Sequence, residues 1–150
     1  MSGITRIPPP IYLVCALLMM LALDHYAPIL TWDSVVTTAG GTAAIVIGVS
    51  ITAWGAGAFS RAGTPIRPFQ PSTVLVTHGL FRLSRNPMYL GMFVVLAGIG
   101  LVLGSLSPLF VIPPFFLLIR NAFVRREEAF LGERFGQAYW VYSRRVPRWF

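Results

Sequence analysis

The amino-acid sequence predicts an all-α integral membrane protein with about four transmembrane helices in a single domain, residues 1–150. Hydrophobic residues make up 55% of the chain and the mean hydropathy is +0.70, above the range of ordinary soluble domains. Charged residues make up only 11%, too few to cover a water-exposed surface. In addition, the apolar residues fall into four segments, each close to the roughly 20 residues that a helix needs to cross a bilayer.

The first predicted span covers about residues 11–30. Arg6 followed by an apolar run resembles a secretory signal peptide. However, Asp24 and His25 stand where such a peptide needs a small-residue cleavage site, so we expect the segment to remain as a membrane span. Cys15 lies within it and is the single cysteine, so no internal disulfide can form, and the sequence suggests no metal site.

The second predicted span, residues 35–59, contains nothing more polar than serine, threonine and one tryptophan. Small residues recur in it at every fourth position and make a ridge on one helix face: Gly40, Ala44, Gly48, Thr52 and Ala56. A ridge of small residues lets a second helix approach closely. Its partner is either another helix of this bundle or a second copy of the chain in a homodimer.

The third and fourth spans, residues 88–104 and 106–124, follow one another almost directly and predict a tight helical hairpin. Pro108 suits the first turn of the fourth helix, whereas Pro113 and Pro114 should kink it.

A long loop, residues 60–87, precedes this hairpin. Four residues that favour turns prevent a regular helix there: Gly63, Pro65, Pro68 and Pro71. Loops of this length are usually functional or disordered. Because Phe69 and Val74 are apolar, we expect an ordered loop against the membrane face.

Arginine supplies all twelve basic residues, and the formal net charge is +7. These arginines flank apolar segments, so we expect a membrane partner and no nucleic acid. With the N-terminus inside, four spans place every arginine on the cytoplasmic side: Arg6, Arg61, Arg67, Arg82, Arg85, Arg120, Arg125, Arg126, Arg134, Arg144, Arg145 and Arg148. Both termini and the loop of residues 60–87 should therefore face the cytoplasm. The arginine-only basicity favours a prokaryotic cytoplasmic membrane.

The last segment, residues 125–150, predicts an amphipathic helix followed by a tail. Four residues fall on one stripe of this helix, at spacings of four, three and four: Leu131, Phe135, Ala138 and Tyr142. Its tyrosine and tryptophan side chains suit the membrane–water interface. We expect the helix to lie at the cytoplasmic surface or to fold back toward it.

Asn86 and Pro87 mark the start of the third helix, since asparagine suits the N-cap and proline the first helical position. The free N–H groups and the positive dipole of this helix end should face the cytoplasmic interface. Arg82 and Arg85 lie beside it, which predicts a site for a carboxylate or a phosphate. Alternatively, these arginines only anchor the helix among anionic lipids.

Glu127 and Glu128 stand side by side just after the fourth span. Glu127 follows Arg120 by seven residues, so the two should share a helix face. Charged groups near membrane depth are costly unless they are paired or functional. The hairpin should bring these groups near Arg85 and form a pocket for a zwitterionic or amphipathic molecule. The alternative is a structural cluster of ion pairs.

Two motifs resemble those of the integral-membrane isoprenylcysteine carboxyl methyltransferases and their phospholipid methyltransferase relatives. The stretch from Arg85 to Gly91, RNPMYLG, is similar to the family pattern Arg-His-Pro-x-Tyr-x-Gly. The second motif consists of Glu127, Glu128, Leu131, Phe135, Gly136, Tyr139 and Tyr142. The ending RRVPRWF also resembles the family's Val-Pro-Arg close, and the likeness covers about residues 73–150 with a weaker echo in AGTPIRP.

This resemblance implies that the protein binds S-adenosylmethionine at the cytoplasmic side, transfers its methyl group and leaves S-adenosylhomocysteine. The acceptor would be lipophilic or amphipathic, with an isoprenylcysteine-type carboxylate or a lipid headgroup. The residues expected at the cofactor are His78, Gly79, Arg85, Asn86, Pro87, Tyr89, Gly91, Arg120, Glu127 and Glu128. Among these, Glu127, Glu128 and Arg85 are the candidate catalytic residues.

The roles within this set stay open. A glutamate could hold the ammonium or ribose of the cofactor while Arg85 holds its carboxylate, and swapped roles fit the sequence equally well. Asn86 stands where the family pattern has histidine, and it cannot act as an acid or base near neutral pH. An amine acceptor would need a base, for which His78 is a candidate.

Two other classes of function remain open. The hairpin and the C-terminal helix also look somewhat like those of membrane sterol reductases, which would bind NADPH, although the chain is short for such an enzyme. A non-catalytic lipid-binding or assembly protein would bind lipid and neither cofactor. Binding of S-adenosylmethionine, of NADPH or of neither separates the three hypotheses.

Overall fold

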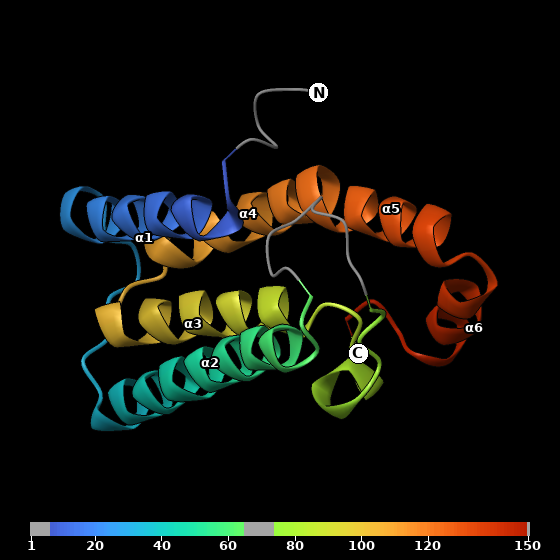
Figure 1. Cartoon of the computed structure of the whole chain (residues 1–150). Coiled ribbons are helices and arrows are strands. Elements are labelled where there is room, and N and C mark those ends of the chain that lie inside the picture. Colours follow the sequence, from blue (N-terminus) through green and yellow to red (C-terminus); the bar gives the residue numbers. More distant parts are fainter. Residues whose placement is uncertain (1–6, 65–73, 150) are drawn as a thin grey trace.

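The computed structural model describes residues 7–64 and 74–149, and this part of the chain consists of helices and turns without strands (Figure 1). The elements in chain order are α1 (Pro9–Tyr26), α2 (Val35–Arg61), the 3-10 turn η2 (Gly79–Arg82), α3 (Pro87–Leu103), the 3-10 turn η3 (Ser107–Val111), α4 (Ile112–Ile119), the π-helical turn η4 (Arg120–Val124), α5 (Arg125–Phe135) and α6 (Gln137–Arg145). The all-α fold class is confirmed. Arg6, Arg67, Phe69 and the three prolines of residues 65–71 lie outside the described residues.

Three helices are long and apolar enough to cross a membrane: α1, α2 and the continuous helix Ser107–Phe135, which contains η3, α4, η4 and α5. The apolar helix α3 is shorter, with 17 residues. The bounds lie close to the predicted spans, except that α1 ends at Tyr26 and not at about residue 30. The chain leaves the helix just before Pro28, since proline cannot continue one.

The helices lie in two layers (Figure 1). One layer contains α1 and α4, with α5 continuing the line of α4, and the other contains α2 and α3 side by side. Met20 of α1, Leu96 of α3 and Ile119 of α4 are fully buried in the main core. Because α3 and α4 run in opposite directions, the predicted hairpin is confirmed. The end of α2, the start of α3 and the end of η4 lie at the same end of the bundle.

Glycines bring the backbones of α2 and α3 into close contact. A Cβ on Gly41 would lie 2.6 Å from the carbonyl oxygen of Gly98, and a Cβ on Gly48 would lie 2.6 Å from that of Gly91. The predicted ridge of small residues therefore packs within the bundle, but its register is different. Gly41 and Gly48 are buried, whereas Gly40 is exposed and its Cβ position has no atom within 4 Å. The homodimer stays a prediction.

The last helical segment differs from the prediction in detail. Pro113 and Pro114 lie in the first turn of α4, directly after the 3-10 turn η3, where a missing backbone N–H is tolerated, and the kink expected there stays a prediction. The single amphipathic helix expected after residue 124 breaks at Gly136, which separates α5 from α6. Gly136 has φ of +51°, a conformation that glycine adopts readily and other residues rarely do.

Serine hydroxyls tie α1 to the α3–η3 turn at the opposite end of the bundle. Ser105 Oγ donates a hydrogen bond to Asp24 Oδ1 (2.5 Å), and Ser107 Oγ donates one to the carbonyl of Ala27 (2.5 Å). Asp24 therefore has a structural partner far from the arginine-bearing helix ends.

Candidate functional site

The start of α3 is built as the sequence predicts, but the asparagine there has a different use. Asn86 occupies the N-cap position and Pro87 is the first helical residue. The Asn86 side chain makes no capping hydrogen bond; its Nδ2 donates to the carbonyl of Arg148 at 3.2 Å. The hydroxyl of Ser84 donates to the same carbonyl at 3.1 Å. Both side chains thereby hold the C-terminal tail, Val146–Trp149, against the helix end.

Arg85 connects this helix end to two other segments. Its side chain is 15% exposed, with Nη1 3.1 Å from Glu128 Oε1 and donating to the hydroxyl of Tyr139 at 3.2 Å. Its backbone N–H donates to the carbonyl of Pro147 at 3.0 Å. The Nε of Arg85 is buried and has no hydrogen-bond partner among the described residues. A buried unpaired donor on a cation is costly, so this atom is available to an anionic or polar ligand.

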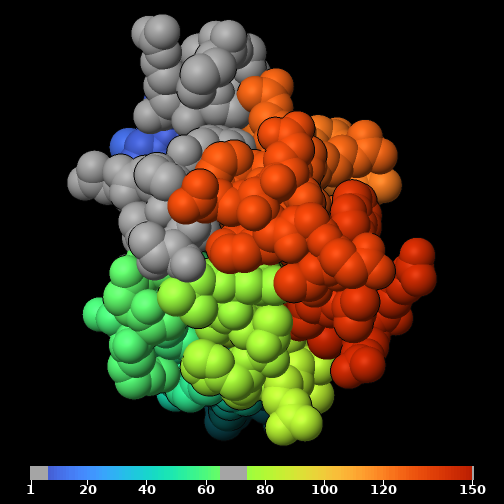
Figure 2. All heavy atoms as spheres, turned by 45° about the vertical axis from the view of Figure 1, so that its right-hand side comes forward, coloured from blue at the N-terminus to red at the C-terminus, as the bar shows by residue number. Residues whose placement is uncertain are grey.

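Glu128 is held by two arginines. Arg148 donates from Nε to Oε1 at 2.9 Å and from Nη2 to Oε2 at 2.6 Å, in addition to the contact of Glu128 with Arg85. This two-pronged geometry is the strong form of an arginine–carboxylate pair. The alternative reading of a structural ion-pair cluster therefore describes Glu128 well. Figure 2 shows residues 74–86 lying against the C-terminal segments on one face of the molecule.

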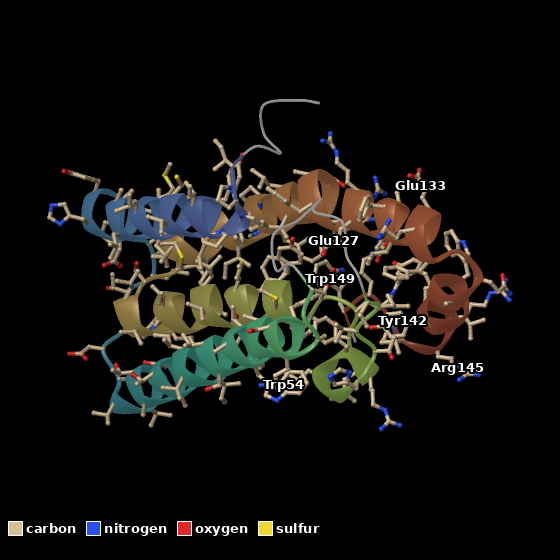
Figure 3. The ribbon with its side chains drawn as sticks, in the orientation of Figure 1. Trp54, Glu127, Glu133, Tyr142, Arg145 and Trp149 are labelled. Carbon is tan, nitrogen blue, oxygen red and sulfur yellow. The ribbon has the colours of Figure 1, made fainter. Side chains whose placement is uncertain are left out.

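Glu127 is in a different situation, although it is the next residue along the chain. Its Oε2 accepts a hydrogen bond from the hydroxyl of Tyr89 at 3.3 Å, and it has no ion-pair partner among residues 7–64 and 74–149. Figure 3 shows Glu127 on the side of α5 that faces α3, and Glu133 on the outer side. Glu127 lies beyond the apolar part of its helix, which ends at Val124. Burial, and then the neighbouring charge of Glu128, raise the pKa of the Glu127 carboxyl to about 7.

The sequence predicts that Arg120 and Glu127 share a helix face, but the structure shows no ion pair between them. Arg120 is partly buried and has no ion-pair partner in the described part of the chain. The prediction assumed a regular α-helix between the two residues. The π-helical turn Arg120–Val124 contains an extra residue per turn and rotates the residues that follow it, so the two side chains no longer share a face.

Other predicted site residues lie apart from these contacts. Arg82 and His78 are exposed at η2, whereas Arg85, the other arginine of the predicted anion site, contacts Glu128 and Tyr139. Gly79 has φ of +61°, and a Cβ there would lie 1.7 Å from the Trp54 ring. A Cβ on Gly91 would meet α2, so close helix packing explains that glycine.

Two residues of the C-terminal region belong to this cluster although neither was a candidate site residue. Arg148 supplies the second cation on Glu128, and Tyr139 accepts from Arg85. Their positions in the Val-Pro-Arg ending and in the second motif were the available signals. Tyr142 reinforces the arrangement by donating to the carbonyl of Phe81 at 2.7 Å, and burial raises its pKa to about 12.

Among the described residues, the cluster thus presents two groups of opposite character with room for a ligand contact: Arg85 Nε has no hydrogen-bond partner, and the Glu127 carboxylate has a tyrosine hydroxyl but no cation. Arg85 Nε can donate to an anion, and the Glu127 carboxylate can accept a cation or a proton. Among the described residues, no group of three histidine, cysteine or acidic side chains could hold a metal ion. The arrangement suits a small zwitterion better than a simple anion.

Comparison with known proteins gives one match. The family model described as phospholipid methyltransferase matches residues 36–138, from the start of α2 into α6. This range contains Arg85, Tyr89, Glu127 and Glu128, and it stops before the C-terminal tail that carries Arg148. Neither the comparison with curated proteins nor that with solved structures gave a match. The chain belongs to the phospholipid methyltransferase family, and thus to a family of membrane methyltransferases.

Proposed function

We propose that this protein transfers a methyl group from S-adenosylmethionine to a lipophilic or amphipathic acceptor at the cytoplasmic face of the membrane. The observation that carries the proposal is the meeting of the first turn of α3 with the first turn of α5. Tyr89 contacts Glu127 there, and Arg85 contacts Glu128. Both pairs lie at the arginine-rich end of the bundle, which the positive-inside rule predicts to face the cytoplasm.

The residues present fit this cofactor. The amino-acid portion of S-adenosylmethionine has a carboxylate and an ammonium. Counting partners in residues 7–64 and 74–149, the cluster has an unpaired arginine donor and a carboxylate without a cationic partner. When bound, S-adenosylmethionine supplies a methyl group on a positively charged sulfur, which departs as a neutral thioether while an acceptor lone pair forms the new bond.

Arg85 and Glu127 would bind and orient, because aligning two reactants is the main task in such a transfer. Glu128 would act indirectly, since its carboxylate is already occupied by Arg85 and Arg148. Its contact with Arg85 holds that guanidinium in place, and Arg148 fixes the position of the Glu128 carboxylate. The proposal thus assigns ligand contacts to Glu127 and structural support to Glu128.

The acceptor decides whether a base takes part. A carboxylate acceptor is already nucleophilic, whereas an ammonium headgroup must first lose a proton. Glu127, with a pKa raised to about 7, is better suited to take that proton than Asn86, which does not titrate. His78 at the exposed start of η2 stays the other candidate base, and Gly79, Pro87, Gly91 and Arg120 stay predicted cofactor residues.

The test is calorimetric titration of S-adenosylhomocysteine into the detergent-solubilised protein. Glu127→Gln removes the negative charge and keeps the shape, and Glu133→Gln on the outer side of the same helix is its matched control. Arg85→Lys keeps a cation for Glu128 but removes Nε, and Arg82→Lys at an exposed position is its control. We expect affinity to fall at least about tenfold in Glu127→Gln and Arg85→Lys, the effect of losing one charge-assisted hydrogen bond.

Equal affinity for S-adenosylhomocysteine in all four variants would show that Glu127 and Arg85 do not bind this ligand. A folded wild-type protein that binds neither S-adenosylhomocysteine nor its parent cofactor would overturn the proposal. In that case the apolar helices would favour the non-catalytic lipid-binding function instead.

A further inference from the structure

An apolar groove lies next to the polar cluster. Its volume is about 590 Å³, within the range of small-molecule sites in proteins. Its walls come from α3, from α4 and from the C-terminal tail, and all of them are apolar: Leu90, Phe93, Val94, Ala97, Ile112, Pro113, Phe116, Leu117 and Trp149. Within this lining the indole N–H of Trp149 is the one side-chain hydrogen-bonding group, so the groove suits a hydrocarbon chain.

Trp149 is the groove residue that comes from neither helix. Its ring lies 5.5 Å from that of Phe93 on α3 and 5.2 Å from that of Phe116 on α4, measured between ring centroids. Phe93 and Phe116 are themselves 5.3 Å apart, so the three rings contact one another in a triangle. The tryptophan thus bridges the two helices at one part of the groove wall.

The polar cluster fixes the position of this tryptophan. The preceding residue, Arg148, has its guanidinium on Glu128 and its carbonyl on Ser84 and Asn86. Trp149 follows Arg148 directly, and consecutive Cα atoms are about 3.8 Å apart. The residue that lines the groove is therefore the chain neighbour of the residue that binds Glu128. Figure 3 places Trp149 and Glu127 in the same region between α3 and the α4–α5 helix.

The same adjacency occurs on α3. Tyr89 donates to Glu127, and the next residue, Leu90, already lines the groove. Phe93 lies one helical turn further into the apolar part. An amphipathic molecule can therefore lie along α3 with its head at the polar cluster and its chain between α3 and α4.

We propose that Trp149 is a specificity-determining residue, which closes the groove beside the polar cluster and selects the hydrocarbon chain of the methyl acceptor. This inference rests on the proposed methyl transfer at Arg85 and Glu127. The occupant is a single-chain amphipath whose headgroup reaches the polar cluster beside the bound cofactor. A wide aromatic ring at this position limits the thickness of the chain that can pass and supplies a rigid contact surface for it.

Photo-crosslinking tests the site without relying on activity. The probe is a lysophosphatidylethanolamine with a diazirine in its acyl chain, added to the full chain in detergent. The variants are Trp149→Ala and Trp149→Phe, and the matched control is Trp140→Ala, an exposed tryptophan of α6 outside the groove. Labelled peptides are mapped by mass spectrometry.

We expect wild-type labelling on the peptides that contain Phe93 and Phe116. Labelling there should fall about tenfold in Trp149→Ala, as when an aromatic anchor is lost, and persist in Trp140→Ala. Trp149→Phe should remain folded and keep the label, with a shifted preference among probes of short, medium and long chains. Melting curves in the same detergent identify any variant that has simply unfolded.

Labelling spread evenly over lipid-facing residues such as Leu18 and Val46 would mean bulk lipid contact and would overturn the proposal. So would unchanged labelling and chain preference in both Trp149 variants. The wild-type titration with S-adenosylhomocysteine reports separately on the proposed function. If the groove is labelled but S-adenosylhomocysteine does not bind, the groove remains a site for a hydrocarbon chain. Its role as the site of a methyl acceptor is then overturned.

Discussion

At the scale of single residues, two adjacent glutamates have different surroundings. The Glu128 side chain is 14% exposed and carries two arginines, whereas Glu127 has a tyrosine hydroxyl and no cation in the described part of the chain. Removing one partner from a largely buried ion pair leaves a charge uncompensated, so a change at Glu128 would weaken the fold as well as the site. Glu127 is therefore the better residue for a test of ligand binding.

Glu127 should make cofactor affinity depend on pH. Because burial raises its pKa to about 7, a cation that binds the carboxylate displaces a proton from much of the protein near neutral pH. The free protein then holds more protons than the complex, so affinity rises with pH. Between about pH 6 and about pH 8 the ionised fraction, and with it the affinity for S-adenosylmethionine, should rise about tenfold.

Calorimetric titration over this pH range checks the expectation. The informative quantity is the ratio of wild-type to Glu127→Gln affinity, because proton exchange on the ligand itself cancels in it. Glu133→Gln should follow the wild type. A ratio that does not change with pH would show that Glu127 does not titrate on binding.

At the scale of the elements, the close packing of α2 against α3 depends on glycines, which have no side chain. Gly48 and Gly91 allow each backbone to reach the other, and Thr52 Oγ1 adds a 3.3 Å hydrogen bond to the carbonyl of Met88. This close approach supports the first turn of α3, which carries Tyr89. Small residues are the usual means of bringing two membrane helices together.

Gly48→Ala should destabilise the protein. The new Cβ would lie 2.6 Å from the Gly91 carbonyl oxygen and 2.8 Å from Val95 Cγ2, so the helices must separate, at a cost of about 1–3 kcal/mol. Gly40→Ala on the same helix meets no atom within 4 Å, so it should leave stability unchanged or raise it by up to about 1 kcal/mol, since alanine favours a helix more than glycine does. Thermal unfolding in detergent measures both, and equal effects would contradict the close crossing.

At the scale of the whole molecule, the site depends on contacts between distant parts of the chain. Ser84 and Asn86 bind the carbonyl of Arg148, which lies 64 and 62 residues further along the chain. The arginine-bearing ends of the helices gather at the same end of the bundle (Figure 1). A single orientation in the membrane therefore places the entire cluster on one face.

The predicted cytoplasmic orientation can be checked with substituted cysteines in a Cys15→Ser background. Asp33→Cys lies in the exposed segment between α1 and α2, and Arg82→Cys lies at exposed η2. We expect a membrane-impermeant maleimide to label Asp33→Cys on intact cells and Arg82→Cys only after permeabilisation. The reverse pattern would place the polar cluster on the outer face.

By itself the sequence determined the fold class, the approximate helix bounds and the two motifs that meet in the site. Hydropathy and the helix-start residues Asn86 and Pro87 are local signals, so they need no knowledge of distant contacts. Only the tertiary structure decided which of the two adjacent glutamates pairs with arginine. The π-helical turn moved Glu127 away from Arg120, and the returning tail placed Arg148 on Glu128. Such contacts depend on how far a helix rotates between two residues and on where a distant segment packs. Residue spacing along the sequence specifies neither.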